Sequence, residues 1–502
     1  MKTGYATASS FVLLVLGCSA AEDPTSPYAP APAPPPEETR PEIDFSPLEA
    51  TIEAERVALG APGAAVIVAH RGKIVLAKGF GTRPDSEAPI QTTTLFRVSS
   101  MAKTWTALTA MRLIEKGELS LDTKVVDRVP GFTVAGSPPE TAALTLRHLL
   151  THRSGLYDGV ASDASAAPAD DGMLGRWIAS PVFQSTFYFM TPPDRTYNYT
   201  NVGYAVAGHM IERASGKPLR TIVRESVLAP LGMSRVLCTP EEILADGDYT
   251  NGKGEVRVID PTVDWSPINY AHGGGSACHA SADDVMKVAR FLLQGDARVV
   301  ADATLRAMKT PSGDSDQPWV ADLYHRLDYG IGLQVSDGLL VDGTYHPLEI
   351  IGHEGSGRGY AGIMQIVPAQ ELAFVALGNA NDAYFDKSFV HAVKLAGLPD
   401  GARTPQRGVD STEYARFVGT YHEPRVLKDV VIRQVDGKLF ADISGLSISG
   451  RELTPDHGRG FELLDVRTEN GYYDHFVHFV PDASGESIEL IRNRYWVAKR
   501  VP

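Results

Sequence analysis

Residues 96–104 have the sequence FRVSSMAKT and open a segment whose apolar residues recur at a spacing of three and four. This spacing predicts a helix over residues 100–116, with Gly117 placed to end it. Ser100 and Lys103 are three residues apart, so a helix puts both side chains on one face, where the amine can reach the hydroxyl.

A serine hydroxyl next to a lysine amine is the minimum set for nucleophilic chemistry. The hydroxyl is a weak nucleophile until a neighbouring base takes its proton. A lysine can act as that base only if burial or nearby positive charge lowers its pKa well below about 10.4. The alternative interpretation is a helix-capping Ser100 with a solvated Lys103, because a single Ser-x-x-Lys arises easily by chance in a long chain.

A Tyr-x-Asn pattern occurs at two places further along the chain. Tyr199-Thr200-Asn201 leads into a helix predicted over residues 201–215, which Asn201 could also cap. Tyr249-Thr250-Asn251 lies among Asp, Gly and Lys residues and is interpreted as a surface turn. We therefore take Tyr199 and Asn201 as the functional candidates.

A His-x-Gly pattern begins at three histidines. His70 lies in a predicted hairpin turn, and His272 opens a glycine-rich approach to a helix predicted over residues 282–294. His353 stands in GHEGSGRGY, residues 352–360, between two strand-like runs.

These three motifs, in this order, resemble those of the class C β-lactamases, the penicillin-binding proteins and their esterase and carboxypeptidase relatives. The resemblance covers roughly residues 46–395. It implies an α+β fold in which helices flank an antiparallel sheet, with Ser100 as the nucleophile. Lys103 and Tyr199 would share the proton transfer, either of them being the base, and Asn201 would position the lysine and the substrate.

The resemblance also assigns the third motif. The strand that carries His353 and Gly355 would line one wall of the site. The backbone N–H groups of Ser356 and Ser100 would form the oxyanion hole. His353 replaces the lysine of typical class C β-lactamases, and a mostly neutral histidine weakens the case for recognising the carboxylate of a β-lactam.

Other motifs add no second catalytic set. His152, within LLTHRSGL at residues 149–156, is a further candidate base, but a buried structural histidine is the favoured interpretation. No Gly-x-Ser-x-Gly, His-Glu-x-x-His or paired Cys-x-x-Cys occurs. The expected mechanism therefore needs neither a metal nor a cofactor.

The amino-terminal residues 1–18 have the pattern of an export signal. Lys2 precedes an apolar run at residues 11–16, and Cys18 follows in an imperfect lipobox, which predicts a lipid anchor at Cys18. Plain secretory cleavage a few residues later is the alternative. Residues 19–44 are rich in Pro and Ala and predict an extended linker to a bacterial membrane, with the protein exported to the periplasm or cell surface.

The rest of the chain is expected to form two folded parts. Residues 45–398 would be the hydrolase domain, in which strands at 64–69 and 73–78 meet later strands between residues 339 and 379 in one sheet. Residues 411–502 alternate in short strands around Asp436-Gly437, the last of them over residues 494–500, and predict a separate all-β barrel or sandwich. Two cysteines besides Cys18 are present, Cys238 and Cys278, and an oxidising compartment permits them to pair, buried free thiols being the alternative.

Composition limits the function. A formal net charge of −14 opposes nucleic-acid binding, because an acidic surface repels a polyanion. The expected partner is a small-molecule or peptide substrate whose amide, β-lactam or ester bond is cleaved through an acyl-enzyme. The alternative is a lipid-anchored penicillin-binding or sensor protein with little turnover, suggested by the extra β domain and by Pro193-Asp194, where relatives have Pro-Gly.

Overall fold

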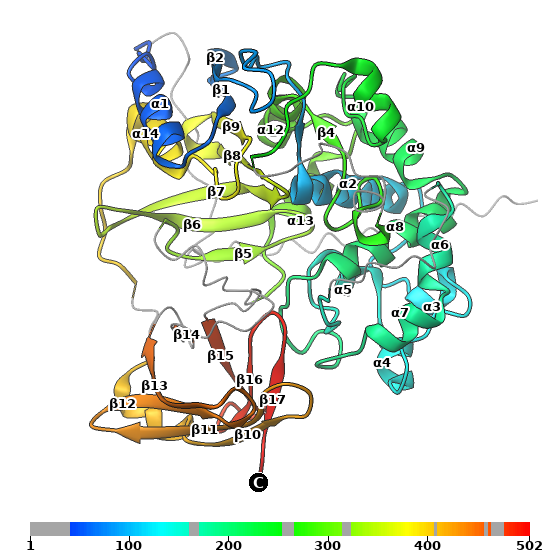
Figure 1. Ribbon diagram of the computed structural model, residues 1–502, viewed down its shortest axis with the longest axis vertical. Coiled ribbons are helices and arrows are strands. Elements are labelled where there is room, and N and C mark those ends of the chain that lie inside the picture. Colours follow the sequence, from blue (N-terminus) through cyan, green and yellow to red (C-terminus); the bar gives the residue numbers. More distant parts are fainter. Residues whose placement is uncertain are drawn as a thin grey trace, which may run out of the picture.

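The computed structural model describes residues 41–159, 170–253, 266–313, 323–405, 409–455, 460–462 and 476–502. Figure 1 shows two bodies, a larger one of helices around a sheet and a smaller barrel formed by the last strands. The predicted signal segment, Cys18 and nearly all of the predicted linker lie outside the described residues. Among the described residues, no helix combines the length and the apolar character needed to cross a membrane.

The larger body is built on a seven-stranded antiparallel sheet with the order β2-β1-β9-β8-β7-β6-β5. Its strands are β1 (Gly63–His70), β2 (Lys73–Gly81), β5 (Leu327–Tyr329), β6 (Gln334–Val341), β7 (Thr344–Gly357), β8 (Tyr360–Val367) and β9 (Leu372–Gly378). Val66 of β1 lies opposite Ala376 of β9. The prediction that the first and last strands meet in one antiparallel sheet is therefore confirmed.

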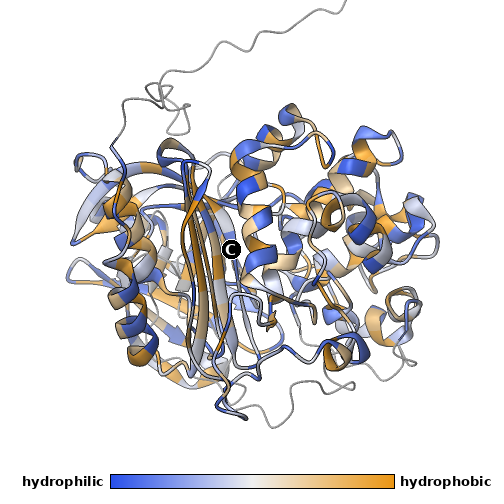
Figure 2. Cartoon of the chain, turned by 90° about the horizontal axis from the view of Figure 1, so that it is seen from above, coloured by the Kyte–Doolittle hydropathy of each residue, from blue (hydrophilic) through white to orange (hydrophobic). Residues whose placement is uncertain are grey.

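Both faces of the sheet are covered by helices. Alternate residues of β1 enter different cores: Val66 and Val68 pack with α1 (Leu48–Ala58) and α14 (Asp386–Gly397). Ile67 packs on the other face with α2 (Ala102–Glu115) and α12 (Ala282–Gln294). Figure 2 shows apolar residues concentrated in the strands, with helices of mixed hydropathy on both sides. This layering explains why β1, β8 and β9 are buried along their whole length.

The helices that follow β2 build the catalytic half of the body. They are α3 (Val125–Arg128), α4 (Pro138–Ala143), α5 (Leu146–Leu150), α6 (Met173–Ile178), α7 (Pro181–Thr186), α8 (Asn201–Ser215), α9 (Leu219–Val223), α10 (Pro240–Asp246) and α13 (Asp302–Lys309). Helices α8 and α12 have the predicted bounds. The predicted helix over 100–116 begins as a 3-10 turn, Ser99–Met101, before α2. A short strand pair, β3 (Phe96–Arg97) with β4 (His279–Ala280), leads into this turn.

The smaller body is a closed barrel. Its strands are β10 (Gly419–Glu423), β11 (Lys428–Val435), β12 (Lys438–Ile443), β13 (Ile448–Pro455), β14 (Gly460–Glu462), β15 (Phe476–Pro481), β16 (Ile488–Arg492) and β17 (Val497–Arg500). Pairing of β10 with β17 closes it, which selects the barrel over the sandwich. Asp436 and Gly437 form the predicted hairpin turn with positive φ values of 50° and 77°. The strand predicted over 494–500 starts only at Val497, because residues 493–496 turn.

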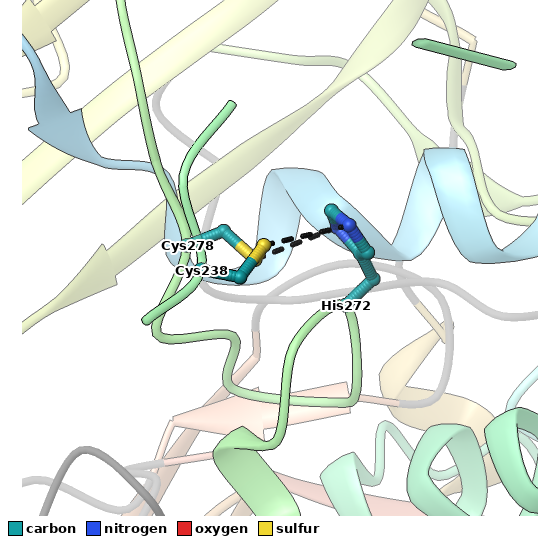
Figure 3. A group of neighbouring side chains, drawn as sticks. All are labelled: Cys238, His272 and Cys278. Carbon is teal, nitrogen blue, oxygen red and sulfur yellow. Dashed lines mark hydrogen bonds between the residues drawn. A yellow bond between two sulfur atoms is a disulfide. The ribbon is translucent and has the colours of Figure 1, made fainter. Parts of the chain in front are cut away.

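Cys238 and Cys278 form a disulfide in the larger body. His272 lies against the two sulfurs, as Figure 3 shows. These three are close enough together to hold a metal ion, but sulfurs joined to each other are not thiolate ligands. The disulfide ties the segment after α9 to the residues that lead into β4. Cys278 also accepts a backbone hydrogen bond from Val98, next to the 3-10 turn that carries Ser100.

Candidate active site

The hydroxyl of Ser100 and the amine of Lys103 lie 2.9 Å apart. The chain reaches this point from β3 through Ser99, whose φ of 45° turns the backbone sharply before the 3-10 turn and α2. Helix α2 is buried nearly all round, so it holds both side chains in a fixed place inside the body. The two groups that sequence spacing placed on one face are thus in direct contact.

Lys103 is completely buried and makes three polar contacts. Its Nζ bonds Ser100 Oγ, Asn201 Oδ1 at 2.9 Å and the backbone carbonyl of Gly274. Burial holds the pKa of this amine well below its usual value; Arg494 acts in the same direction and Asp158 opposes it. A neutral amine has two N–H groups and one lone pair. In the neutral form that this lowered pKa favours, the two carbonyl oxygens can accept both N–H groups, which leaves the lone pair for the proton of Ser100.

Tyr199 lies beside this pair. Its ring centroid is 4.6 Å from Lys103 Nζ, and its hydroxyl shares a hydrogen bond with Ser100. Burial raises the pKa of Tyr199, although the bond with Ser100 and the positive charge of Arg494 act against the rise. At neutral pH Tyr199 therefore keeps its proton. Its hydroxyl can donate or relay a proton, but it is not a tyrosinate anion that could accept one.

Helix α8 presents Asn201 to Lys103. The predicted capping role falls to the neighbouring residue, since Thr200 Oγ1 accepts from Gly203 N at 3.4 Å. The Asn201 amide is then available for the lysine, and its own backbone N–H donates to Asp158 at 2.7 Å. The prediction that Asn201 also caps its helix is wrong, because Thr200 occupies the cap position and Asn201 is the first helical residue.

Strand β7 brings the third motif to the other side of Ser100. Gly355 packs so closely that a Cβ there would come within 3.2 Å of Ser100 N and 2.3 Å of Val98 O. Ser356 is exposed next to it, and Tyr384 hydrogen-bonds its side chain. The structure thus places the strand predicted to line the site against the nitrogen predicted to stabilise the oxyanion.

His353 is buried in this strand and neutral. Burial and the neighbouring Lys103 lower its pKa to about 3. Its Nδ1–H donates to the Glu354 carbonyl at 2.6 Å, so Nε2 accepts from the Tyr329 hydroxyl at 2.9 Å. The position held by lysine in typical class C β-lactamases therefore carries no positive charge here.

The remaining candidates lie elsewhere or are structural. His152 is buried among Tyr199, Tyr204 and Tyr329, and its Nδ1 accepts from Thr200 N at 3.1 Å. Burial holds the pKa of His152 well below its usual value, as expected of a structural residue. His70 and His272 are also buried, at a hairpin and at the disulfide.

The second Tyr-x-Asn segment is not a simple surface turn. Thr250 is fully buried, and its backbone N–H donates to Leu95. The Asn251 side-chain amide donates from Nδ2 to Asp85 Oδ2 at 2.5 Å, so it binds a residue of another loop and not a residue of the Ser100 site. The segment pairs with the strand region before β3, which makes it structural; a local excess of Asp, Gly and Lys had suggested exposure.

Sequence reasoning missed two charged residues of the site. Asp158 is 4% exposed and accepts from the backbone of Asn201 and from Arg494. Arg494 comes from the barrel, and its guanidinium carbon lies 4.8 Å from the Tyr199 ring centroid. Neither residue belongs to a local pattern; only the order LLTHRSGLYD, residues 149–158, placed Asp158 near a segment already singled out.

Together the fold and the site define a serine hydrolase of the β-lactamase and transpeptidase class. A family model described as "Beta-lactamase" matches residues 48–395, and the chain belongs to that family.

The chain is similar to proteins of several kinds. The chain is 28% identical to "Penicillin-binding protein 4" of Amycolatopsis lactamdurans over 396 residues, covering 76% of this chain and 98% of that protein. It is 31% identical to "Esterase EstB" of Burkholderia gladioli over 263 residues, 45% of this chain and 64% of the esterase. The solved structure of SurE with D-Leu superposes with a TM-score of 0.63 at 22% identity, covering 91% of this chain and 99% of SurE. That similarity extends over the barrel as well as the larger body.

Proposed function

We propose that the protein hydrolyses ester and amide bonds through an acyl-enzyme on Ser100. The observation that carries the proposal is the set of contacts at Lys103, a buried amine whose pKa is lowered by burial and whose N–H groups face two carbonyl oxygens. The remaining lone pair faces the Ser100 hydroxyl at 2.9 Å. A serine with a neutral amine in this position is activated for attack at neutral pH.

The proposed reaction has two halves. In the first, the Ser100 proton passes to Lys103 while Oγ bonds to the substrate carbonyl carbon, and the N–H groups of Ser100 and Ser356 stabilise the oxyanion. The bond to the leaving group then breaks, and the leaving group takes the proton from Lys103 by way of the Tyr199 hydroxyl. In the second half, water gives a proton to the same base, bonds to the acyl carbon and releases the acid, and Ser100 regains its proton.

The neutral His353 supports esters and peptide-like amides as substrates over β-lactams. A permanently charged lysine at this position would attract the carboxylate that β-lactams carry, and a histidine with a pKa of about 3 does not. Relatives named as a penicillin-binding protein and as an esterase are consistent with a site that accepts either bond. We expect slow β-lactam turnover beside faster ester cleavage.

Covalent labelling tests the proposal. A fluorophosphonate should modify the purified protein, and mass mapping should place the adduct on Ser100. Ser100→Ala should lose both the label and the hydrolysis of a chromogenic ester. Label that persists unchanged in Ser100→Ala would show that another residue carries the chemistry.

The same assay separates turnover from simple binding. The barrel contacts the rim of the site through Arg494, and this contact supports the alternative function as a binding protein. A chromogenic ester or cephalosporin should give many product molecules per protein molecule. A burst of one equivalent that then stops would instead identify a penicillin-binding or sensor protein.

We also propose that the protein is exported and anchored by a lipid on Cys18. The lipobox-like order before Cys18 and the Pro/Ala-rich stretch after it support this, and the Cys238–Cys278 disulfide is compatible with an oxidising compartment. Labelled palmitate should enter the wild-type protein in a bacterial host. If Cys18→Ser took up as much label as the wild type, the anchor would be disproved.

A further inference from the structure

The barrel meets the larger body at the rim of the active site. Figure 1 shows the turn between β16 and β17 reaching from the barrel toward the helices of the larger body. A small apolar cluster lies at this contact, formed by Met190, Leu490 and Val497 with Tyr157, Tyr188 and Val480 packed against it. Arg425 of the barrel stacks on the Tyr188 ring at 3.4 Å. The two bodies are thus joined by side-chain packing as well as by the chain between them.

The turn that points toward the site is held firmly. Asn493 is buried, and its side-chain oxygen accepts from the backbone N–H of Tyr495 at 2.8 Å and of Trp496 at 3.0 Å. Trp496 packs into the barrel core. The turn therefore presents Arg494 from a fixed base in the barrel.

Arg494 grips one oxygen of Asp158. Its Nε and Nη2 lie 3.1 Å and 2.6 Å from Asp158 Oδ2. The other oxygen, Oδ1, accepts from Asn201 N at 2.7 Å and from Thr200 Oγ1 at 3.3 Å. Asp158 is only 4% exposed, and a carboxylate so deeply buried needs a charged partner. The Arg494 guanidinium also covers the Tyr199 ring.

We infer that Arg494 is a positioning residue of the active site: through Asp158 it fixes the Tyr199-Thr200-Asn201 segment against Lys103, so that the barrel is a working part of the catalytic centre. The inference rests on the proposed function of Ser100 and Lys103. It adds a residue and a role for the barrel that the three motifs do not contain.

The charges around Lys103 give this role a distinctive signature. The groups that face the lysine from its surroundings are Asp158, Arg494, Tyr199, Tyr204, His152 and His353. Removal of Arg494 takes away a positive charge that lowers the pKa of Lys103. It also leaves the Asp158 carboxylate, which raises that pKa, without its charged partner. Both changes raise the pKa of Lys103. Because Lys103 works as the neutral base, the acidic limb of the rate profile then moves to higher pH.

The test compares full-length variants with a chromogenic ester over a range of pH. Arg494→Ala should lower kcat/KM on the order of 10²-fold, the loss typical of a displaced catalytic segment, and shift the acidic limb upward. The double variant Arg494→Ala with Asp158→Asn should return the limb toward the wild-type pH, because the carboxylate is gone. Arg425→Ala is the matched control: it removes an arginine from the same interface and should change neither the rate nor the pH profile.

A second variant covers a folding failure, and separate results distinguish failure of this inference from failure of the proposed function. If Arg494→Ala does not fold, Arg494→Lys replaces it in the test. Lysine keeps the positive charge but lacks the planar guanidinium that binds Asp158 through two N–H groups. It should lower kcat/KM about tenfold or more and leave the acidic limb of the pH profile in place. Wild-type kinetics in Arg494→Lys, or an Arg494→Ala variant that matches Arg425→Ala in rate and pH profile, would overturn the inference. Failure of the wild-type protein to label at Ser100 and to turn over substrate would instead overturn the proposed function.

Discussion

At the residue scale, the site depends on close backbone contact as much as on reactive groups. Gly355 shows this best, since any side chain there would overlap Val98 O and press on Ser100 N. The contact brings β7 against the start of the catalytic helix, and it leaves room for nothing larger than hydrogen. A glycine in the third motif is therefore a steric requirement of the site.

Gly355→Ala should consequently damage both the fold and the chemistry. The added methyl must push β7 away from Ser100, and overpacking of this kind costs about 1–3 kcal/mol of stability. We expect fluorophosphonate labelling of Ser100 to slow by at least about tenfold, since small displacements of a reacting group are costly. Thermal unfolding and labelling rates measured on one preparation check both effects, and wild-type labelling would show that the strand has room to move.

Residue identities predicted part of this site and not the rest. Ser100 and Lys103 are close in sequence, so helix geometry alone brings them together. Tyr199, Asn201 and His353 were found through family motifs, and the structure places them around the same lysine. Asp158 and Arg494 are 336 positions apart, and nothing local in either segment indicates their ion pair.

At the scale of elements, the strongest predictions were the long periodic ones. The bounds of α8 and α12 follow directly from their apolar spacing, while the residues that cap them, Thr200 and Ser281, were not predicted. Short helices such as α6 and α7 were not predicted, because six residues carry too little periodicity and are held by tertiary packing. The turn at residues 493–496 was absorbed into a predicted strand, since its alternation of residues resembles one.

The amino-terminal caps of two helices give a controlled experiment. Thr200 caps α8 and Thr239 caps α10, each by accepting from a backbone N–H of the first turn. Thr200→Ala and Thr239→Ala should each reduce the free energy of unfolding by about 1 kcal/mol. Only Thr200→Ala should also reduce activity, because its hydroxyl donates to Asp158 beside Asn201.

A third variant and one contradicting outcome complete the comparison of Thr200→Ala with Thr239→Ala. Thr200→Ser keeps the hydroxyl and should recover most of the activity measured with a chromogenic ester. Equal activity losses in the two alanine variants would mean that α8 affects catalysis only through general stability.

At the scale of the whole molecule, buried neutral histidines make stability sensitive to acid. Burial lowers the pKa to about 3 for each member of one group, of which the first three are buried and the last is half-buried: His272, His279, His353 and His478. Their pKa in the unfolded chain is about 6.5, so between these values the unfolded state binds more protons. Asp386 opposes the trend, since burial raises its pKa to about 7, and Glu349, whose pKa burial also raises, acts with it.

The histidines outnumber the opposing carboxyl groups, so stability should fall as the pH drops from 6.5 to 5. Each net proton contributes about 1.4 kcal/mol per pH unit once the unfolded histidine is protonated. Urea unfolding at the two pH values should show a loss of a few kcal/mol. His478→Gln, in the barrel and away from Ser100, should flatten the dependence, and a stability that rose on acidification would contradict the assignment.

The pairing of β1 with β9 has a consequence for how the protein is made. Strand β1 is buried throughout, and its partner β9 lies more than half of the chain further on. At a synthesis rate of about 5–20 residues per second, β1 leaves the ribosome tens of seconds before β9 exists. Until then the sheet has no centre, and the larger body cannot complete the cores on its two faces.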